Sequence, residues 1–268
     1  MAMTEAPMAL SVSVLPGIPL VAAGMDLARL IASAAQQAGV VLGAQDVVVV
    51  AQKIVSKAEG RVVDLGCVEA GPLALELAAL TGRLPALAQL ILDEATEVMR
   101  ATPAAIITRH RTGHVTANSG IDASNVEGGN VEGGSVAGGA GDMVLLWPRD
   151  PDASARAIRA GLPGKPAVVI ADSLGRAWRQ GTVGTAIGAA GLVHTDDRRG
   201  QVDMFGRTLQ ATIVAVADAI AAFAVLAIGE GAEGTPVAIV RGAGRWVTET
   251  DGTGAAAIMR PAEGDLFP

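Results

Sequence analysis

Two short polar segments, far apart in the chain, contain the residue types that bind a divalent metal ion. One is Asn118-Ser119-Gly120-Ile121-Asp122-Ala123-Ser124-Asn125, and the other is Asp172-Ser173-Leu174-Gly175-Arg176. In each, small or polar neighbours surround one carboxylate, so that the backbone can approach a ligand closely. Asp and Ser oxygens are hard ligands that suit Mg²⁺ or Mn²⁺. The pattern therefore predicts that Asp122 and Asp172 meet over a divalent metal ion.

Lysine, rare in this chain, is concentrated in a third polar segment. Only three lysines occur, and two of them, Lys53 and Lys57, belong to the segment 52–61. This segment directly follows the β-branched run 46–51, and α/β proteins tend to place ligand sites after a buried strand. Cations beside a metal ion suit a polyphosphate, and phosphoryl transfer depends mainly on positioning and charge neutralisation. The residues thus predict metal-dependent phosphate chemistry.

A glycine-rich loop at 229–234 matches Gly-x-Gly-x-x-Gly. A dinucleotide fingerprint requires a strand before this motif and a helix after it, whereas the order expected here is the reverse. The loop can still bind phosphate through backbone N–H groups. Arg176 and Arg179 are further candidates for holding phosphate oxygens.

The periodicity of apolar residues predicts the elements that position these groups. Strands are expected over 11–15, 46–51, 104–108, 114–117, 143–147, 167–171 and 236–240, and helices over 26–39, 71–80, 86–100, 153–160 and 209–228. Asp152 is expected to cap the helix 153–160. His110 and His114 have the spacing of zinc ligands on a helix, but Gly113 predicts a hairpin there, so we expect no metal between them.

Composition excludes several classes of function. The 268 residues include three Phe, three Trp and no Tyr, and the net charge is -7. These values argue against base stacking and against a broad phosphate-backbone footprint, so no nucleic-acid partner is expected. The single Cys67 fits a reducing compartment, Met1–Val14 lacks the basic start of a signal peptide, and Asp218 interrupts the longest apolar run. We therefore expect a cytoplasmic protein that does not enter a membrane.

The segment 127–141 nearly repeats Val-Glu-Gly-Gly. It has too little apolar surface to order itself, which predicts a flexible glycine-rich insertion. A second hypothesis is that it forms a lid over the site.

Several motifs occur in the order found in one known family. They are Gly-Ile-Pro-Leu (17–20), Val-Ser-Lys-Ala-Glu-Gly-Arg (55–61), Ser-Gly-Ile-Asp-Ala-Ser-Asn-Val (119–126), Asp-Pro-Asp (150–152), Asp-Ser-Leu-Gly-Arg-Ala-Trp-Arg-Gln-Gly (172–181), Asp-Met-Phe-Gly-Arg (203–207) and Gly-Thr-Pro-Val-Ala-Ile-Val-Arg-Gly (234–242). From about Leu15 to Gly242 the chain resembles the coenzyme F-420 gamma-glutamyl ligases of the CofE type.

The resemblance implies an α+β fold of two subdomains with mixed sheets and flanking helices, forming an intertwined homodimer. The whole chain, 1–268, would be one ligase unit. The implied activity is GTP-dependent addition of L-glutamate to a deazaflavin precursor, coenzyme F-420-0, followed by γ-linked glutamates. Mg²⁺ or Mn²⁺ would be required, K⁺ would affect the activity, and the other partners would be small molecules.

The resemblance also implies roles for individual residues. Lys57, Asp122 and Asp172 would be catalytic. The implied metal ligands are Asp122, Asp172, Ser173 (where the family usually has Thr) and Glu230 (where we expect Gln at a second metal). The implied GTP-binding residues are Ile18, Pro19, Leu20, Val21, Gln52, Lys53, Lys57, Asn125, Gly229, Gly231 and Gly234.

The chemistry expected of such a ligase is activation of a carboxylate as an acyl phosphate, since an ionised carboxylate is a poor electrophile. Two alternatives stay open. One is a carboxylate–amine ligase that acts on another phosphorylated acid. The other is a nucleotide- and metal-binding module without catalytic activity.

Overall fold

A mixed five-stranded sheet forms the centre of the protein. The computed structural model describes residues 9–127, 131–132, 135–136, 142–260 and 264. The strand order is β1 (Ser11–Val14), β14 (Val237–Arg241), β2 (Val47–Ala51), β10 (Ala167–Gly175) and β11 (Thr182–Ala190). β2 and β10 are parallel, and every other neighbouring pair is antiparallel.

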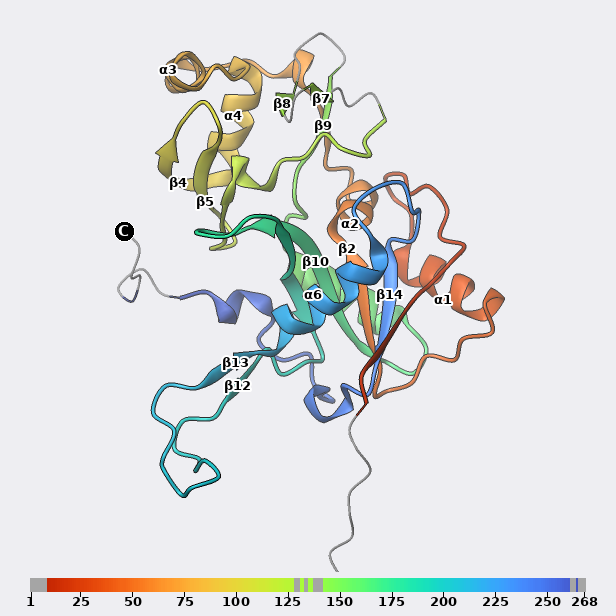
Figure 1. Cartoon of the computed structure of the whole chain (residues 1–268). Coiled ribbons are helices and arrows are strands. Elements are labelled where there is room, and N and C mark those ends of the chain that lie inside the picture. Colours follow the sequence, from red (N-terminus) through yellow and green to blue (C-terminus); the bar gives the residue numbers. More distant parts are fainter. Residues whose placement is uncertain (1–8, 128–130, 133–134, 137–141, 261–263, 265–268) are drawn as a thin grey trace, which may run out of the picture.

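Helices cover both faces of this sheet (Figure 1). The run of valines in β2 alternates between the faces, as the two-residue period of a strand requires. Val48 and Val50 pack with α1 (Leu27–Gln37), α2 (Gln52–Ala58) and α5 (Pro151–Gly161). Val47 and Val49 pack with α6 (Val216–Ile228) on the opposite face.

A third core lies at one end of the molecule, away from the central sheet (Figure 1). Its elements are α3 (Pro72–Thr81), α4 (Pro85–Glu94), β4 (Ala95–Ala101), β5 (Ile106–His110), β6 (Val115–Ala117) and the turn η1 (Leu65–Cys67). The strands β4, β5 and β6 form an antiparallel sheet, and β3 (Val62–Asp64) pairs with β9 (Met143–Leu145).

The remaining elements are short. β12 (Thr195–Asp197) and β13 (Ile213–Ala215) begin an arm that extends away from the sheet in Figure 1. The other elements are β7 (Val131–Glu132), β8 (Ser135–Val136), and the turns η2 (Asn118–Gly120), η3 (Gly244–Trp246) and η4 (Ala255–Ile258).

The α+β class is confirmed, and most predicted elements occur within a few residues of their expected bounds. The hairpin predicted around Gly113 is also confirmed, because β5 and β6 pair there. The two-subdomain division and the intertwined homodimer stay predictions.

Two predicted helices were too long. The helix expected over 86–100 ends at Glu94, and the chain continues as β4 because that strand pairs with β5. The helix expected over 209–228 begins at Val216, after the short strand β13 has paired with β12. In both cases tertiary pairing overrides the local helical pattern.

The predicted cap of α5 was wrong by two residues. Asp150, not Asp152, accepts the hydrogen bond from the Ala153 N–H. The Asp152 carboxylate is buried and accepts from the Ala189 and Ala255 amides, so it joins α5 to β11 and η4.

No element was predicted over β11, because its composition is mainly glycine and alanine. The structure gives the reason for two of these glycines. A Cβ on Gly184 would lie 2.6 Å from the Ala221 carbonyl of α6, and one on Gly188 would lie 2.4 Å from the Pro151 carbonyl of α5. The strand is therefore pressed between helices on both faces.

Most of the predicted insertion 127–141 lies outside the described residues, apart from the pairing of β7 with β8. In the described part of the chain, no single helix has the length and apolar content needed to cross a membrane, although the bent pair α3 and α4 meets both criteria together.

Candidate functional site

A cavity of about 460 Å³ opens where β2 and β10 reach the edge of the central sheet. It is bounded by the start of α2, the segment after η2, the loop that follows α6, and the extended residues 18–21. The structure brings to this cavity all the residues that the resemblance implies as metal ligands or GTP-binding residues: Ile18, Pro19, Leu20, Val21, Gln52, Lys53, Lys57, Asp122, Asn125, Asp172, Ser173, Gly229, Glu230, Gly231 and Gly234. Their individual roles stay predictions.

The first wall of the cavity is α2. Lys53 and Lys57 are one helical turn apart, so both side chains project from the same face. Lys57 Nζ donates to the Asn125 carbonyl at 2.7 Å. Burial and the neighbouring charge of Lys53 lower the pKa of Lys57. Gln52 is buried and its amide donates to the Ser56 hydroxyl at 2.6 Å, so it braces the helix.

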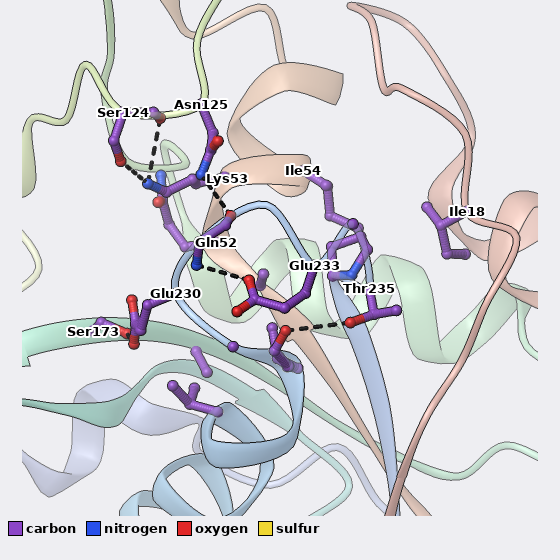
Figure 2. Close-up of a pocket in the computed structure, with 18 of the residues that line it drawn as sticks. Ile18, Gln52, Lys53, Ile54, Ser124, Asn125, Ser173, Glu230, Glu233 and Thr235 are labelled. Atoms are coloured by element: carbon purple, nitrogen blue, oxygen red, sulfur yellow. Dashed lines mark hydrogen bonds between the residues drawn. The ribbon is translucent and has the colours of Figure 1, made fainter.

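Asp122 is paired with a cation. Lys53 donates to its carboxylate and also to the Ser124 hydroxyl, at 2.5 Å in the second case. The Ser124 N–H donates to the other Asp122 oxygen at 2.7 Å. Burial opposes ionisation, but the Lys53 charge and these hydrogen bonds outweigh it and lower the pKa of Asp122. Figure 2 shows Lys53 directed at Ser124 beside Asn125.

Asp172 has a different environment. It lies within β10, which extends beyond the predicted end at Ala171, and its Oδ2 accepts from Trp147 Nε1 at 2.8 Å. Burial raises the pKa of Asp172 and the charge of Asp122 adds to the effect, while hydrogen bonds from Ser173 and Trp147 and the charge of Lys53 oppose it without outweighing it. This electrostatic coupling agrees with both carboxylates lining one cavity. The neighbouring Ser173 hydroxyl donates to Glu230, and Figure 2 shows these two side chains next to each other.

The loop after α6 presents backbone groups to the cavity. The Gly231 N–H donates to the Glu233 carboxylate at 2.7 Å, and the Gly231 carbonyl accepts from the Asn125 side chain at 3.3 Å. Gly229 adopts a φ of 82°, and a Cβ there would lie 2.4 Å from the Glu233 carboxyl carbon. Glu233 thus places an anion on the loop that was predicted to bind phosphate.

The donor set fits a divalent ion that is shared with a substrate. Within the described residues, no three His, Cys, Asp or Glu side chains cluster as a closed metal cage. Mg²⁺ is usually held by one or two carboxylates while water and substrate phosphates complete its shell. Asp122, Asp172 and the Ser173 hydroxyl match that requirement, and Glu230 adds a fourth oxygen donor.

Some predicted residues are not at the cavity. Arg176 and Arg179 are exposed in the turn between β10 and β11, and neither is among the described residues that line the cavity. His110 and His114 are buried against Trp147 with ring centroids 4.8 and 5.4 Å away.

Three residues at or beside the site were missed. Ser124 could have been found, since it follows Asp122 by two residues and hydroxyl side chains often bond so locally. Glu233 lies within the glycine loop but was not singled out. Trp147 contacts Asp172 across 25 residues of chain, and no local pattern signals that contact.

Comparison with known proteins supplies the family. A model described as F420-0:Gamma-glutamyl ligase matches residues 17–242 of the chain. The chain belongs to the F420-0:gamma-glutamyl ligase family. In this family member, every residue that lines the cavity, from Ile18 to Pro236, falls inside the matched range.

Relatives of the F420-0:gamma-glutamyl ligase family extend the similarity over nearly the full length. A protein named coenzyme F420:L-glutamate ligase from Methanothermobacter thermautotrophicus is 41% identical over 264 residues, which is 97% of this chain and 99% of that protein. Proteins of the same name from Methanocaldococcus jannaschii and Methanopyrus kandleri are 41% and 40% identical, over 83% and 91% of this chain and 84% and 92% of their own lengths. The resemblance inferred from the motifs is confirmed.

Proposed function

We propose that the protein is a GTP-dependent ligase that adds L-glutamate to coenzyme F-420-0 and then adds further glutamates by γ-linkage. Family membership over residues 17–242 is the observation that carries this proposal. The names of the relatives supply the substrate class, and the cavity supplies a set of residues suited to metal-dependent phosphate chemistry.

The proposed reaction has two steps. A carboxylate oxygen of the precursor attacks the γ-phosphorus of GTP, the bond to the β-phosphate oxygen breaks, and an acyl phosphate and GDP form. The glutamate amine then attacks the acyl carbon, the carbon–oxygen bond to phosphate breaks, and the products are the amide, inorganic phosphate and a proton. The first step overcomes the poor electrophilicity of the carboxylate.

Different residues of the chain would bind different parts of the nucleotide. Lys57 and Lys53 would bind phosphate oxygens as charge moves toward the leaving GDP. The residues 18–21 and the glycine loop would hold the rest of the nucleotide, and Asn125 links the loop to the Asp122 segment by its hydrogen bond to Gly231. Orientation of this kind lowers the barrier because the reacting groups no longer have to find each other.

Asp122, Asp172, Ser173 and Glu230 would hold the Mg²⁺ or Mn²⁺. A bound divalent ion supplies charge neutralisation on the phosphate oxygens in phosphoryl transfer. The proposal also includes activity dependent on K⁺, an intertwined homodimer and a cytoplasmic location.

Mass-detected ligation tests the function. The protein is incubated with F-420-0, L-glutamate, Mn²⁺ and either GTP or ATP, and the masses of the products are measured by mass spectrometry. We expect a gain of one or more glutamate residues with GTP and much less product with ATP. Absence of any gain, with the precursor intact, contradicts the proposal and favours a different acceptor.

A matched pair of variants tests the site. Lys57→Met should abolish ligation, because the phosphate loses a cation inside the cavity. Lys165→Met removes the third lysine of the chain, which is exposed and outside the cavity, and should leave ligation unchanged. If GTP is bound but neither phosphate nor product is released by the unaltered protein, a binding module without catalytic activity is the better description.

A further inference from the structure

The buried indole of Trp147 is fixed in the interior on several sides. Trp147 is 0% exposed, and its carbonyl accepts from Arg61 Nε at 2.9 Å. The His110 ring is tilted 59° to the indole at 4.8 Å, and the His114 ring meets it nearly edge-on at 5.4 Å. Such contacts leave the indole little freedom to change rotamer.

Gly120 packs against another side of the Trp147 indole. It adopts a φ of 69°, and a Cβ at this position would lie 2.4 Å from Cε2 of the indole. Any other residue at 120 would displace the ring. The segment that presents Asp122 to the cavity is therefore packed directly on Trp147.

The two histidines are themselves held in place. Thr112 Oγ1 lies 2.8 Å from His110 Nδ1 and 2.9 Å from His114 Nδ1. The Glu94 carboxylate binds Arg61 at 2.7 Å and lies 3.3 Å from His110 Nε2. The indole is thus supported by a network of buried polar groups rather than by apolar packing alone.

The indole N–H points at one atom, Oδ2 of Asp172, at 2.8 Å. An indole N–H only donates, so this bond favours the ionised carboxylate against the opposing effect of burial, and it fixes the orientation of the group. In the described part of the chain, no Lys, Arg or His lies within ion-pair distance of Asp172, in contrast to the Lys53 pair of Asp122. A neutral donor orients the carboxylate without cancelling its charge.

We propose that Trp147 is a positioning residue that holds the Asp172 carboxylate in the orientation needed to bind the divalent metal ion. This inference rests on the metal role proposed for Asp172. Removal of a group that hydrogen-bonds a metal ligand commonly changes metal affinity by about 10- to 100-fold. The proposal therefore concerns metal binding itself and does not require any step of the ligation reaction.

The test measures Mn²⁺ binding, by the loss of the electron paramagnetic resonance signal of free Mn²⁺, in the whole protein without substrates. Trp147→Phe keeps an aromatic ring and removes the N–H. We expect its dissociation constant for Mn²⁺ to rise about 10-fold. Trp246→Phe makes the same change at a partly buried indole outside the cavity and should leave the constant unchanged.

A second variant separates the hydrogen bond from packing. Benzothienylalanine at position 147 replaces only the N–H by sulfur and preserves the ring shape. It should raise the Mn²⁺ dissociation constant about as much as Trp147→Phe while the melting temperature stays close to that of the unaltered protein. Wild-type Mn²⁺ affinity in this variant overturns the proposal.

Nuclear magnetic resonance provides a measurement of the Trp147 environment that does not depend on turnover. With ¹⁵N-labelled tryptophan, addition of Mg²⁺ should shift the Trp147 indole resonance, assigned by its loss in Trp147→Phe, more than that of Trp246. An unmoved Trp147 resonance counts against the proposal. If Mn²⁺ binding depends on Trp147 but no glutamate is ever added, the proposed ligase function fails while this inference stands.

Discussion

Lys53 of α2 donates a hydrogen bond to the carboxylate of Asp122, a residue 69 positions further along the chain. The two carboxylates that line the cavity therefore have hydrogen-bond donors of different charge. Asp122 is paired with a charged amine, and Asp172 is paired with the neutral N–H of Trp147. We expect ligation to require both carboxylates, each held by its own donor.

We expect Asp122→Asn and Asp172→Asn each to abolish ligation and to weaken Mn²⁺ binding at least 10-fold, because each removes a charged oxygen ligand without changing the shape of the side chain. Circular dichroism and gel filtration should show an intact fold. Asp93→Asn changes an exposed carboxylate on α4 and serves as the control. Near-normal turnover in either cavity variant would remove that residue from the metal site.

Glu233→Gln should strengthen nucleotide binding. The Glu233 carboxylate accepts the Gly231 N–H inside the cavity, where it competes with a phosphate group for that donor and repels its charge. We expect the dissociation constant for GTP, measured by calorimetry, to fall several-fold. Glu76→Gln neutralises an exposed carboxylate on α3 and should have no effect. Weaker GTP binding in Glu233→Gln would show instead that this carboxylate contributes to the site.

The surroundings of Glu94 allow a prediction of how the stability of the fold changes at acidic pH. Burial alone would raise its pKa, but hydrogen bonds from His110 and Arg61 and the charges of Arg61 and Arg111 lower the pKa to about 2. The ionised form therefore contributes stability that is fully present above pH 4.5 and is lost as the pH falls toward 2.

Glu94→Gln should lower the free energy of unfolding by about 3–5 kcal/mol at pH 7, because it leaves buried arginine charge without its partner. The difference in free energy of unfolding between the variant and the unaltered protein, measured by urea unfolding, should become smaller below pH 4.5. Glu97→Gln, which alters an exposed pair with Arg109, is the control. A constant difference from pH 7 to pH 3 would argue that the Glu94 charge does not contribute.

His114 predicts a second pH dependence at milder acidity. Burial lowers its pKa to about 4, so the imidazole stays neutral in the fold while the unfolded chain takes up a proton below about pH 6.5. Protonation of the unfolded state alone should cost about 2 kcal/mol of stability between pH 7 and pH 5. Urea unfolding of His114→Gln should lack that part of the loss, and an identical pH dependence in both proteins would refute the assignment.

The carboxylates of the site were predictable because each is embedded in a local pattern. Asp172 follows a run of buried apolar residues, and Asp122 lies among small polar residues, so that both were found without knowledge of the fold. Lys53 and Lys57 were found for the same reason, as the polar start of a segment that follows a strand. The central strands were predictable because valine and isoleucine alternate between two buried faces.

The parts that could not be predicted depend on contacts between distant segments. β4 has a helical pattern and becomes a strand only because β5 is available as a partner. β11 has almost no strand signal, since its glycines are required by the helices on either side. The support of Asp172 by Trp147 likewise becomes visible only when the segment that follows β9 is placed beside β10.

The position of β14 has a consequence for synthesis of the protein. This strand comes from the last part of the chain, yet it lies between β1 and β2 near the middle of the sheet. A nascent chain on the ribosome lacks it until residue 241 has left the exit tunnel, so β1 has no neighbouring strand to pair with. The cavity, which residues 229–236 help to line, is therefore complete only when nearly the whole chain has been made, and contacts this distant in sequence predict slow folding after release.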